Sequence, residues 1–292
     1  MFKNSEYKTL NKLLICGYTP YLVDFAGILN HDGFEILTFI LPDNRHSELM
    51  DHTLDYLKEA GFPFIYQPPA EAFADLVSRL KPDMLFCFSH TRKIPGAVLA
   101  VENVRKVNCH LGLLPEYRCL NPVNRAIING DTITGFTIHE LVDEMDAGDI
   151  YYRETVPLDR EDTALDVTLR LIGRLKVCLP SILRDIYYGK LRAVPQDQEK
   201  AHYYPPIDYF IEGLLDWNRP GDEIMRKIRA FAPPWPGAFF YLEEKKIIVE
   251  KAFFLPGEKA SDPGLKKRLE GKIIACCRDG EIIIEKYHLL RD

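Results

Sequence analysis

Short apolar runs alternate with amphipathic stretches of helix length through the first part of the chain, and this alternation most constrains the fold. The apolar runs are KLLICGY from residue 12, then FEILTFILP, PFIYQ, DMLFCFS and KVNCHL. Strands that alternate with helices are typical of βαβ units, in which parallel strands form a sheet with helices on both faces. The pattern therefore predicts an α/β fold with a doubly wound, mostly parallel sheet.

Three amphipathic segments carry helix signals. Gly61 follows the segment from Ser47 to Ala60, and Pro82 follows a segment rich in leucine and valine. Glycine adopts the left-handed conformation that ends many helices, and proline cannot continue a helix. A third segment, from Thr163 to about Tyr188, predicts a long helix packed on the sheet, with a kink or a break at Pro180.

The chain is long enough for more than one domain. Its 292 residues suggest about two domains at roughly 150 residues each. The stretch from residue 190 to 206 is polar and contains proline, as domain linkers do, and short strands with glycine-bearing turns follow it. We therefore predict a larger domain over residues 1–200 and a smaller, β-rich, OB-like domain over residues 201–292.

Charge and cysteine content narrow the class of protein. The 37 Lys and Arg residues against 43 Asp and Glu give a net charge of −6, which argues against a constitutive nucleic-acid or anionic-membrane binder. The seven cysteines include no metal-like CxxC pair, so we expect no disulfide framework and no metal site. The sequence shows neither a signal peptide nor a membrane-spanning apolar run, which predicts a soluble, cytoplasmic protein with a small-molecule ligand.

Asn108, Cys109 and His110 follow directly on a predicted central strand. Ligands of open α/β sheets bind beyond the carboxyl ends of the strands, so this position favours a functional site. Side chains two residues apart on an extended segment point to the same side, so one substrate atom can meet both the Asn108 amide and the His110 ring. Cys109 points away from both and is interpreted as a buried core thiol. A polar loop cluster without function is the alternative.

Asp146 lies in the turn MDAGD, just before another predicted strand. Such turn carboxylates are common and are often structural, so Asp146 alone says little. Together with Asn108 and His110, and without a serine or cysteine nucleophile at the turn, it indicates polarisation of a carbonyl and management of a proton. Direct acyl transfer to an amine needs these two functions.

The run from residue 108 to 158 resembles the formyltransferases that use 10-formyltetrahydrofolate. The shared features are the Asn-x-His strand end, the LLP turn with a following arginine, the NG turn before a TG-x-T-x-H strand, and the Asp-x-Gly-Asp turn. The resemblance extends from about Lys12 to Phe240, and the last fifty residues match only loosely. It implies a Rossmann-like formyltransferase domain.

The resemblance assigns roles to residues. Asn108, His110 and Asp146 match the family's catalytic trio: the Asn108 amide would polarise the formyl carbonyl, His110 would take up the amine proton or stabilise the oxyanion, and Asp146 would orient the imidazole. The folate pocket would lie between two loops, where Phe88 and Ile94 could equally be core residues. The residues matching these loops are Phe88, Arg92 and Ile94 in one and Val142, Asp143, Glu144 and Met145 in the other.

The family acts on initiator tRNA, purine precursors or amino sugars carried on a nucleotide diphosphate. The tRNA-modifying members carry a basic insertion where this chain has residues 39–56, which contain one arginine and several acids. The purine-pathway members are shorter chains, and the segment WPGAF at 235–239 resembles the amino-sugar enzymes. We therefore expect no nucleic-acid partner, and a nucleotide-linked amino sugar, with a 4-amino sugar favoured, as substrate.

Two residues are candidates for binding that substrate. Tyr117 and Arg118 could contact its phosphates or its sugar, and each could equally be structural. A methionyl-tRNA formyltransferase and a non-catalytic folate- or nucleotide-binding module remain as alternatives. The sequence does not fix the sugar, its nucleotide, the position of its amine, or whether the protein is a homodimer.

Overall fold

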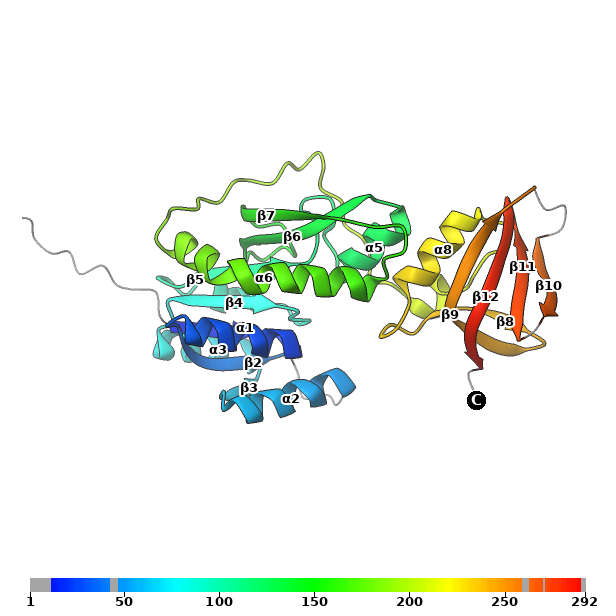
Figure 1. The fold of residues 1–292 in the computed structure, drawn as a ribbon. Helices are drawn as coiled ribbons and strands as arrows, with labels where there is room; N and C mark the ends of the chain where they lie inside the picture. Colours follow the sequence, from blue (N-terminus) through cyan, green and yellow to red (C-terminus); the bar gives the residue numbers. More distant parts are fainter. Residues whose placement is uncertain (1–11, 43–46, 259–262, 270, 290–292) are drawn as a thin grey trace, which may run out of the picture. The chain divides into compact units, whose positions relative to one another are not determined.

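A computed structural model describes residues 12–42, 47–258, 263–269 and 271–289, and it contains two sheets (Figure 1). The first sheet has seven strands in the order β3-β2-β1-β4-β5-β6-β7. The five neighbouring strands β3, β2, β1, β4 and β5 pair in parallel, and β6 pairs with β5 in the antiparallel direction. The strands are β1 (Lys12–Cys16), β2 (Glu35–Leu41), β3 (Phe64–Tyr66), β4 (Met84–Phe88), β5 (Arg105–His110), β6 (Ile133–Glu140) and β7 (Ile150–Pro157). The predicted mostly parallel α/β sheet is confirmed.

Helices cover both faces of this sheet, because side chains that alternate along β4 point to opposite faces and contact different helices. On one face, Leu85 and Cys87 of β4 pack with Phe73 of α3 (Ala70–Leu80). On the other face, the ring of Phe88 meets that of Phe25 from α1 (Pro20–His31) at a centroid distance of 5.3 Å. The remaining helices of this part of the chain are α2 (Glu48–Ala60), α4 (Gly96–Leu99), α5 (Pro122–Asn129) and α6 (Ala164–Tyr187). The sheet is therefore doubly wound.

Two local expectations need correction. A kink or a break was expected at Pro180, and because the helix α6 is continuous through this residue the break is wrong, whereas the kink stays a prediction. Apolar side chains on both sides of Pro180, including Leu175 and Leu183, are buried, and this packing outweighs the loss of one backbone hydrogen bond. The stretch after β5, for which the sequence predicted no helix, contains α5, which begins at Pro122 and ends before Gly130 in the left-handed conformation.

The second sheet is antiparallel and lies in the last part of the chain. Its five strands follow the order β10-β11-β12-β9-β8, and its predicted β-rich character is confirmed. The strands are β8 (Ala238–Leu242), β9 (Lys245–Pro256), β10 (Gly264–Leu269), β11 (Lys272–Cys277) and β12 (Gly280–Leu289). Two helices precede them, α7 (Tyr209–Glu212) and α8 (Gly221–Ala230).

The chain separates into two compact units. The first contains residues 1–118, 135–154 and 172–203, and the second contains residues 119–134, 155–171 and 204–292. The single boundary near residue 200 stays a prediction. In the described residues, no helix has both the length and the apolar character needed to cross a membrane.

Two glycines of the first unit provide a matched test of the packing. At Gly17, with φ of 147°, an added Cβ would lie 1.9 Å from the carbonyl oxygen of Phe88, whereas at Gly27 in α1 it would meet nothing within 4 Å. We expect Gly17→Ala to lower the free energy of unfolding by roughly 2 kcal/mol or more. Gly27→Ala should raise it by about 0.5–1 kcal/mol. Urea unfolding measures both, and equal effects would contradict the described contact.

Candidate active site

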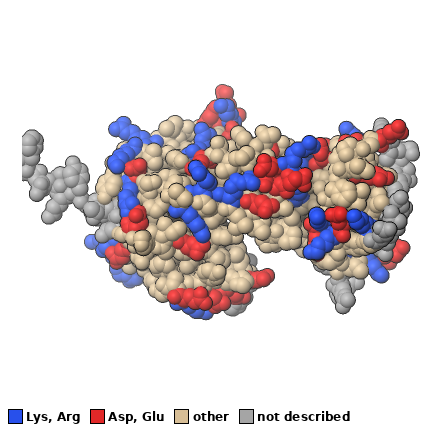
Figure 2. Space-filling view, viewed as in Figure 1, with Lys and Arg blue, Asp and Glu red and all other residues tan. Residues whose placement is uncertain are grey.

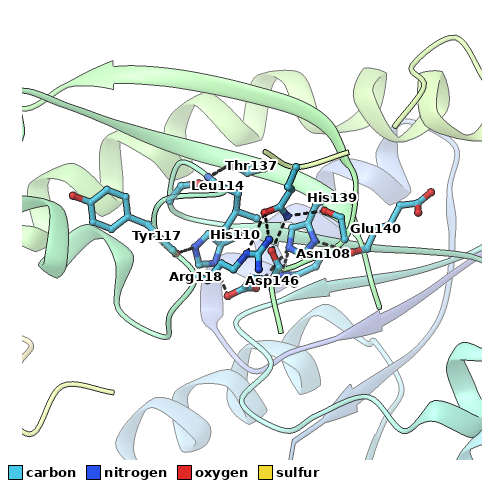
Figure 3. A network of polar contacts seen from close by, with 12 residues as sticks. Asn108, His110, Leu114, Tyr117, Arg118, Thr137, His139, Glu140 and Asp146 are labelled. Carbon is cyan, nitrogen blue, oxygen red and sulfur yellow. Dashed lines mark hydrogen bonds and ion pairs between the residues drawn. The ribbon is translucent and has the colours of Figure 1, made fainter. Parts of the chain in front are cut away.

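The end of β5 places Asn108 and His110 on one side of the strand and Cys109 on the other. Cys109 is buried, and its pKa is raised well above the usual value by burial and by nearby Cys178 of α6. A thiol held in its neutral form on the opposite side of the strand is poorly suited to be the nucleophile of this site. Asn108 and His110 remain as the groups facing the polar cluster (Figure 3).

The antiparallel register of β5 and β6 brings His139 opposite Asn108. Asn108 Nδ2 lies 3.0 Å from His139 Nε2, and His139 Nδ1 lies 2.7 Å from the carbonyl oxygen of Glu140. Because a carbonyl oxygen only accepts, the Nδ1 atom carries a proton and donates, which leaves Nε2 to accept from the Asn108 amide. His139 thereby fixes the orientation of the Asn108 side chain.

A second histidine, His110, is fixed in the same way. Its Nε2 lies 2.7 Å from the carbonyl oxygen of Tyr117 and therefore carries a proton. Its other ring nitrogen, Nδ1, lies 3.6 Å from Oδ2 of Asp146, and Oδ1 of the same carboxylate lies 3.7 Å from Nε2 of His139. The structure thus brings Asn108, His110 and Asp146 together around one point, with His139 as a fourth member (Figure 3).

Electrostatics keep the imidazole neutral and the carboxylate charged. Burial lowers the pKa of His110, although the Asp146 charge acts in the opposite direction. Burial raises the pKa of Asp146, but His110, His139 and the Arg118 guanidinium outweigh it and leave that pKa below its usual value. At neutral pH, the lone pair of His110 Nδ1 and a negative carboxylate therefore face each other, an arrangement that can accept a proton from a third group.

The Asp146 turn has an unusual backbone. Asp146 adopts a left-handed conformation with φ of 54°, and a Cβ at Gly148 would lie 2.0 Å from the carbonyl oxygen of Glu140. Non-glycine residues adopt this conformation at a cost, which the surrounding structure must offset. Gln196 contributes here, because its Nε2 donates to the carbonyl oxygens of Asp146 and Gly148, each at 2.7 Å.

Comparison with known families decides the class of protein. The formyl transferase family matches residues 49–182, and the C-terminal domain of formyl transferases matches residues 211–290. The chain belongs to the formyl transferase family. The two matched regions include β5, the Asp146 turn and the five-stranded antiparallel sheet.

Relatives of this formyl transferase are known in sequence and in structure. The bifunctional polymyxin resistance protein ArnA of Wigglesworthia glossinidia brevipalpis is 32% identical over 214 residues, which are 73% of this chain and 32% of ArnA, so the chain spans about a third of that relative. An N-formyltransferase from Helicobacter canadensis, solved with folinic acid and dTDP-3-aminofucose, has a TM-score of 0.73 at 19% identity, covering 95% of this chain and 100% of that one. HypX from Aquifex aeolicus in complex with tetrahydrofolic acid has a TM-score of 0.69 at 19% identity, and the match covers 97% of this chain and 45% of HypX.

The residues predicted to bind substrate occupy two different environments. Arg118 is 5% exposed, and its guanidinium donates to the side chains of Gln196, Gln198 and Glu144. The ring of Tyr117 points away from the polar cluster (Figure 3). Arg118 is thus held beside Asp146, and direct contact of either residue with a phosphate stays a prediction.

The first predicted folate loop divides into core and surface residues. Phe88 and Ile94 are buried in the sheet's packing, as the alternative interpretation anticipated. Arg92 is exposed, and its Nη1 donates to the carbonyl oxygen of Pro42 at 3.1 Å. Of the three, Arg92 is the one whose side chain is exposed, and contact of all three residues with folate stays a prediction.

The second predicted folate loop contains residues next to Asp146 in the polar cluster. Val142 and Met145 are 41% and 38% exposed, so two apolar side chains flank the buried carboxylate of Asp146. Asp143 pairs with Lys93 at 2.8 Å, and Glu144 pairs with Arg118 at 3.3 Å. Among the described residues, no group of three His, Cys, Asp or Glu side chains could hold a metal ion.

Sequence reasoning missed two residues that orient the cluster, His139 and Gln196. His139 could have been found, because it lies in the TG-x-T-x-H motif and an antiparallel return strand would place it beside Asn108. Gln196 carries no such signal, since it lies in the stretch interpreted as a linker. Its position depends on the path of the chain after α6.

The buried His110 ring predicts a measurable pH effect. In the folded protein we expect it to protonate at a lower pH than in the unfolded chain, where the ordinary value is 6.5. The unfolded state then binds the proton first, so this group makes the folded state less stable as the pH falls below 6.5. NMR titration of the histidine rings, with His110→Gln for assignment, measures this, and a folded-state pKa at or above 6.5 would contradict it.

Proposed function

We propose that this formyl transferase moves a formyl group from 10-formyltetrahydrofolate to the amino group of a nucleotide-linked amino sugar, with direct attack of the amine on the formyl carbon. The observation that carries the proposal is the convergence of Asn108, His110 and Asp146 at the carboxyl end of β5. Family membership supports the formyl chemistry. The nature of the acceptor rests on separate arguments below.

Asn108 provides the group that polarises the formyl carbonyl. One hydrogen of its amide is used by His139 Nε2 at 3.0 Å, which leaves the other free to donate to a carbonyl oxygen. As the amine attacks, negative charge develops on that oxygen, and a donor already oriented stabilises it more than the uncharged carbonyl. The half-buried position of Asn108 limits competition from water.

His110 and Asp146 manage the proton. The attacking amine must be neutral, and the facing pair of His110 Nδ1 and Asp146 Oδ2, 3.6 Å apart, can accept the proton that the amine loses. A proton held between them is stabilised by the carboxylate charge, while the Tyr117 carbonyl keeps the imidazole in the required tautomer. As the bond between the formyl carbon and N10 of the folate breaks, this proton can pass to N10, which leaves as the amine of tetrahydrofolate. Asp146 therefore has both an orienting and an electrostatic role.

The residues around the trio fit the proposed folate co-substrate. The exposed side chains of Val142 and Met145 supply an apolar surface next to Asp146, which suits a flat pterin ring. The exposed Arg92 guanidinium supplies a positive charge for the carboxylates of the glutamate part of folate. The side chains of Asp143 and Glu144 pair with Lys93 and Arg118, so these two residues would contact the folate through their backbone groups.

The surface of α2 favours a small acceptor over initiator tRNA. Glu48, Asp51, Asp55 and Glu59 all lie on exposed positions of this helix, which begins within the stretch where tRNA-modifying relatives carry a basic insertion. Four carboxylates repel a phosphate backbone. Figure 2 shows Lys and Arg intermixed with Asp and Glu over most of the face in view. Residues 43–46 of that stretch lie outside the described residues.

A nucleotide amino sugar is the acceptor that remains. Such an acceptor agrees with two expectations from the sequence, namely that the protein is cytoplasmic and that it has no nucleic-acid partner. Support comes from the Helicobacter canadensis relative, whose complex contains dTDP-3-aminofucose. The 4-amino position favoured by the sequence and the 3-amino position of that ligand are both chemically suitable.

An acceptor panel tests the proposal. The protein is incubated with 10-formyltetrahydrofolate and with UDP-, dTDP- and GDP-linked 3-amino and 4-amino sugars, and formamide products are identified by mass spectrometry. Formylation of at least one sugar is expected. Formylation of charged initiator tRNA alone would establish the tRNA alternative, and folate binding without any transfer would favour a non-catalytic binding module.

A further inference from the structure

The segment from Val194 to Tyr203, here called the strap, is joined by backbone hydrogen bonds to both sides of the candidate site. Val194 and Ile150 exchange two backbone hydrogen bonds, of 2.8 and 2.9 Å, at the start of β7. At the other end, His202 donates to the carbonyl oxygen of Pro115, and Arg118 donates to that of His202, both at 3.0 Å. The stretch expected to be a linker is therefore, in its second half, a structural part of the first unit.

One side chain of the strap points into the site. Gln196 is 6% exposed, whereas its neighbours Pro195 and Asp197 are exposed. A buried amide is costly unless its hydrogen bonds are made, and here both ends of the amide are satisfied. Burial of a lone polar residue in a polar surface segment indicates that its bonds have a specific use.

The donor end of Gln196 holds the turn that carries Asp146. Nε2 donates to the carbonyl oxygens of Asp146 and Gly148, each at 2.7 Å, and so uses both of its hydrogens. These two carbonyls flank the left-handed backbone of the turn, so the amide fixes the direction in which the Asp146 carboxylate leaves the chain. A shift of that carboxylate would change its 3.6 Å separation from His110.

The acceptor end of Gln196 holds Arg118. Oε1 accepts from Nε of Arg118 at 3.2 Å and from Nη2 at 2.8 Å. The guanidinium so placed also pairs with Glu144 and acts on Asp146, whose pKa it helps to lower. One amide therefore connects the strap, the arginine and the turn with the carboxylate.

We propose that Gln196 is a positioning residue for the transfer reaction, because it sets the place of the Asp146 carboxylate relative to His110 through the backbone of the turn. The expected effect of Gln196 on kcat rests on the proposed function. Its expected effect on the position of the Asp146 carboxylate beside His110 does not depend on catalysis. Gln196 has no contact of its own with the cluster formed by Asn108, His110 and the carboxylate of Asp146 in the bonds described above.

Three substitutions at this position test the hydrogen bonds of the amide. One of them, Gln196→Glu, separates the bond to Arg118 from the bonds to the turn. Gln196→Met removes every hydrogen bond and keeps the approximate length of the side chain. Gln196→Glu keeps an acceptor for Arg118 but turns the donor into an oxygen that faces two carbonyl oxygens. Gln196→Asn is a milder change that withdraws the amide by one bond. Asp197→Asn is the matched control, because Asp197 is exposed and its carboxylate pairs with Lys200 and accepts from the backbone of Glu199.

For Gln196→Met and Gln196→Glu we expect kcat to fall by about 10- to 100-fold, with the KM for 10-formyltetrahydrofolate within about threefold of the original value. Asp197→Asn should keep the original kcat. Because Asp146 raises the pKa of His110, displacing the carboxylate should also lower the pH at which the His110 ring titrates by NMR in Gln196→Met, the variant that adds no charge of its own. A role confined to stability would lower the melting temperature without moving this titration.

The outcomes distinguish the two proposals. A wild-type protein without transfer activity would count against the proposed function, and the His110 titration would still test the positioning role. An unchanged titration in the folded Gln196→Met variant would overturn that role, as would an unchanged kcat in an active enzyme. If Gln196→Glu behaved like the wild type while Gln196→Met did not, the bond to Arg118 would be the important one, and positioning through the turn would be overturned.

Discussion

Substitution of Asp146 by asparagine is expected to lower kcat by roughly 10²- to 10⁴-fold, while the affinity for 10-formyltetrahydrofolate changes little. The asparagine keeps the size of the side chain but removes the negative charge beside His110 Nδ1. Without that charge, a proton taken from the amine is no longer stabilised next to the imidazole. Steady-state kinetics for kcat and calorimetric titration for the affinity measure the two quantities separately.

A control for this substitution is available on α3. Asp75 lies at an exposed position of that helix, so Asp75→Asn removes one charge from the same unit without touching the site. It should leave kcat and folate affinity unchanged. Equal activity of Asp146→Asn and the wild type would remove the proposed role of Asp146, and a parallel loss of folate affinity would assign the residue to binding instead.

The predicted sheet was confirmed because its signals are local. The runs around Leu14 and Leu85 are apolar on both faces, as strands buried on both sides must be, and they became β1 and β4. The helix α5 was missed although Pro122 and Gly130 mark its two ends. At eight residues it is too short to show a clear period, and its glycine was interpreted as part of a turn.

The candidate site was predictable to the extent that it depends on one strand. Alternation along β5 is enough to place Asn108 and His110 on one side and Cys109 on the other. His139 needed the direction of β6, which reverses the parallel pattern, and Gln196 needed the path of the strap. Long-range contacts of this kind produce no periodic pattern in the sequence. For this reason His139 and Gln196, which orient other residues of the site, were missed.

This division has a physical reason. The groups proposed to touch the reacting atoms, Asn108, His110 and Asp146, must be of particular chemical types, and that restriction is visible in the sequence. Some of the groups that hold them, such as the carbonyl of Tyr117 beside His110 and that of Glu140 beside His139, are backbone atoms that any residue can supply. Tautomer and orientation in this site are therefore set by the fold, and only the structure reveals them.

Replacement of Asn108 by leucine should reduce kcat by about 10²- to 10³-fold, because it removes the donor proposed to stabilise charge on the formyl oxygen. It also leaves Nε2 of His139 without its hydrogen bond, which is expected to lower the free energy of unfolding by about 1–3 kcal/mol. Asn124→Leu provides the matched control, since the buried Asn124 amide donates to the carbonyl oxygen of Ala230 at 2.6 Å in the second unit. Both variants should lose stability, measured by urea unfolding, but Asn124→Leu should keep the kcat of the folded enzyme. A common loss of kcat in the two variants would attribute the effect to unfolding and leave Asn108 without a specific role.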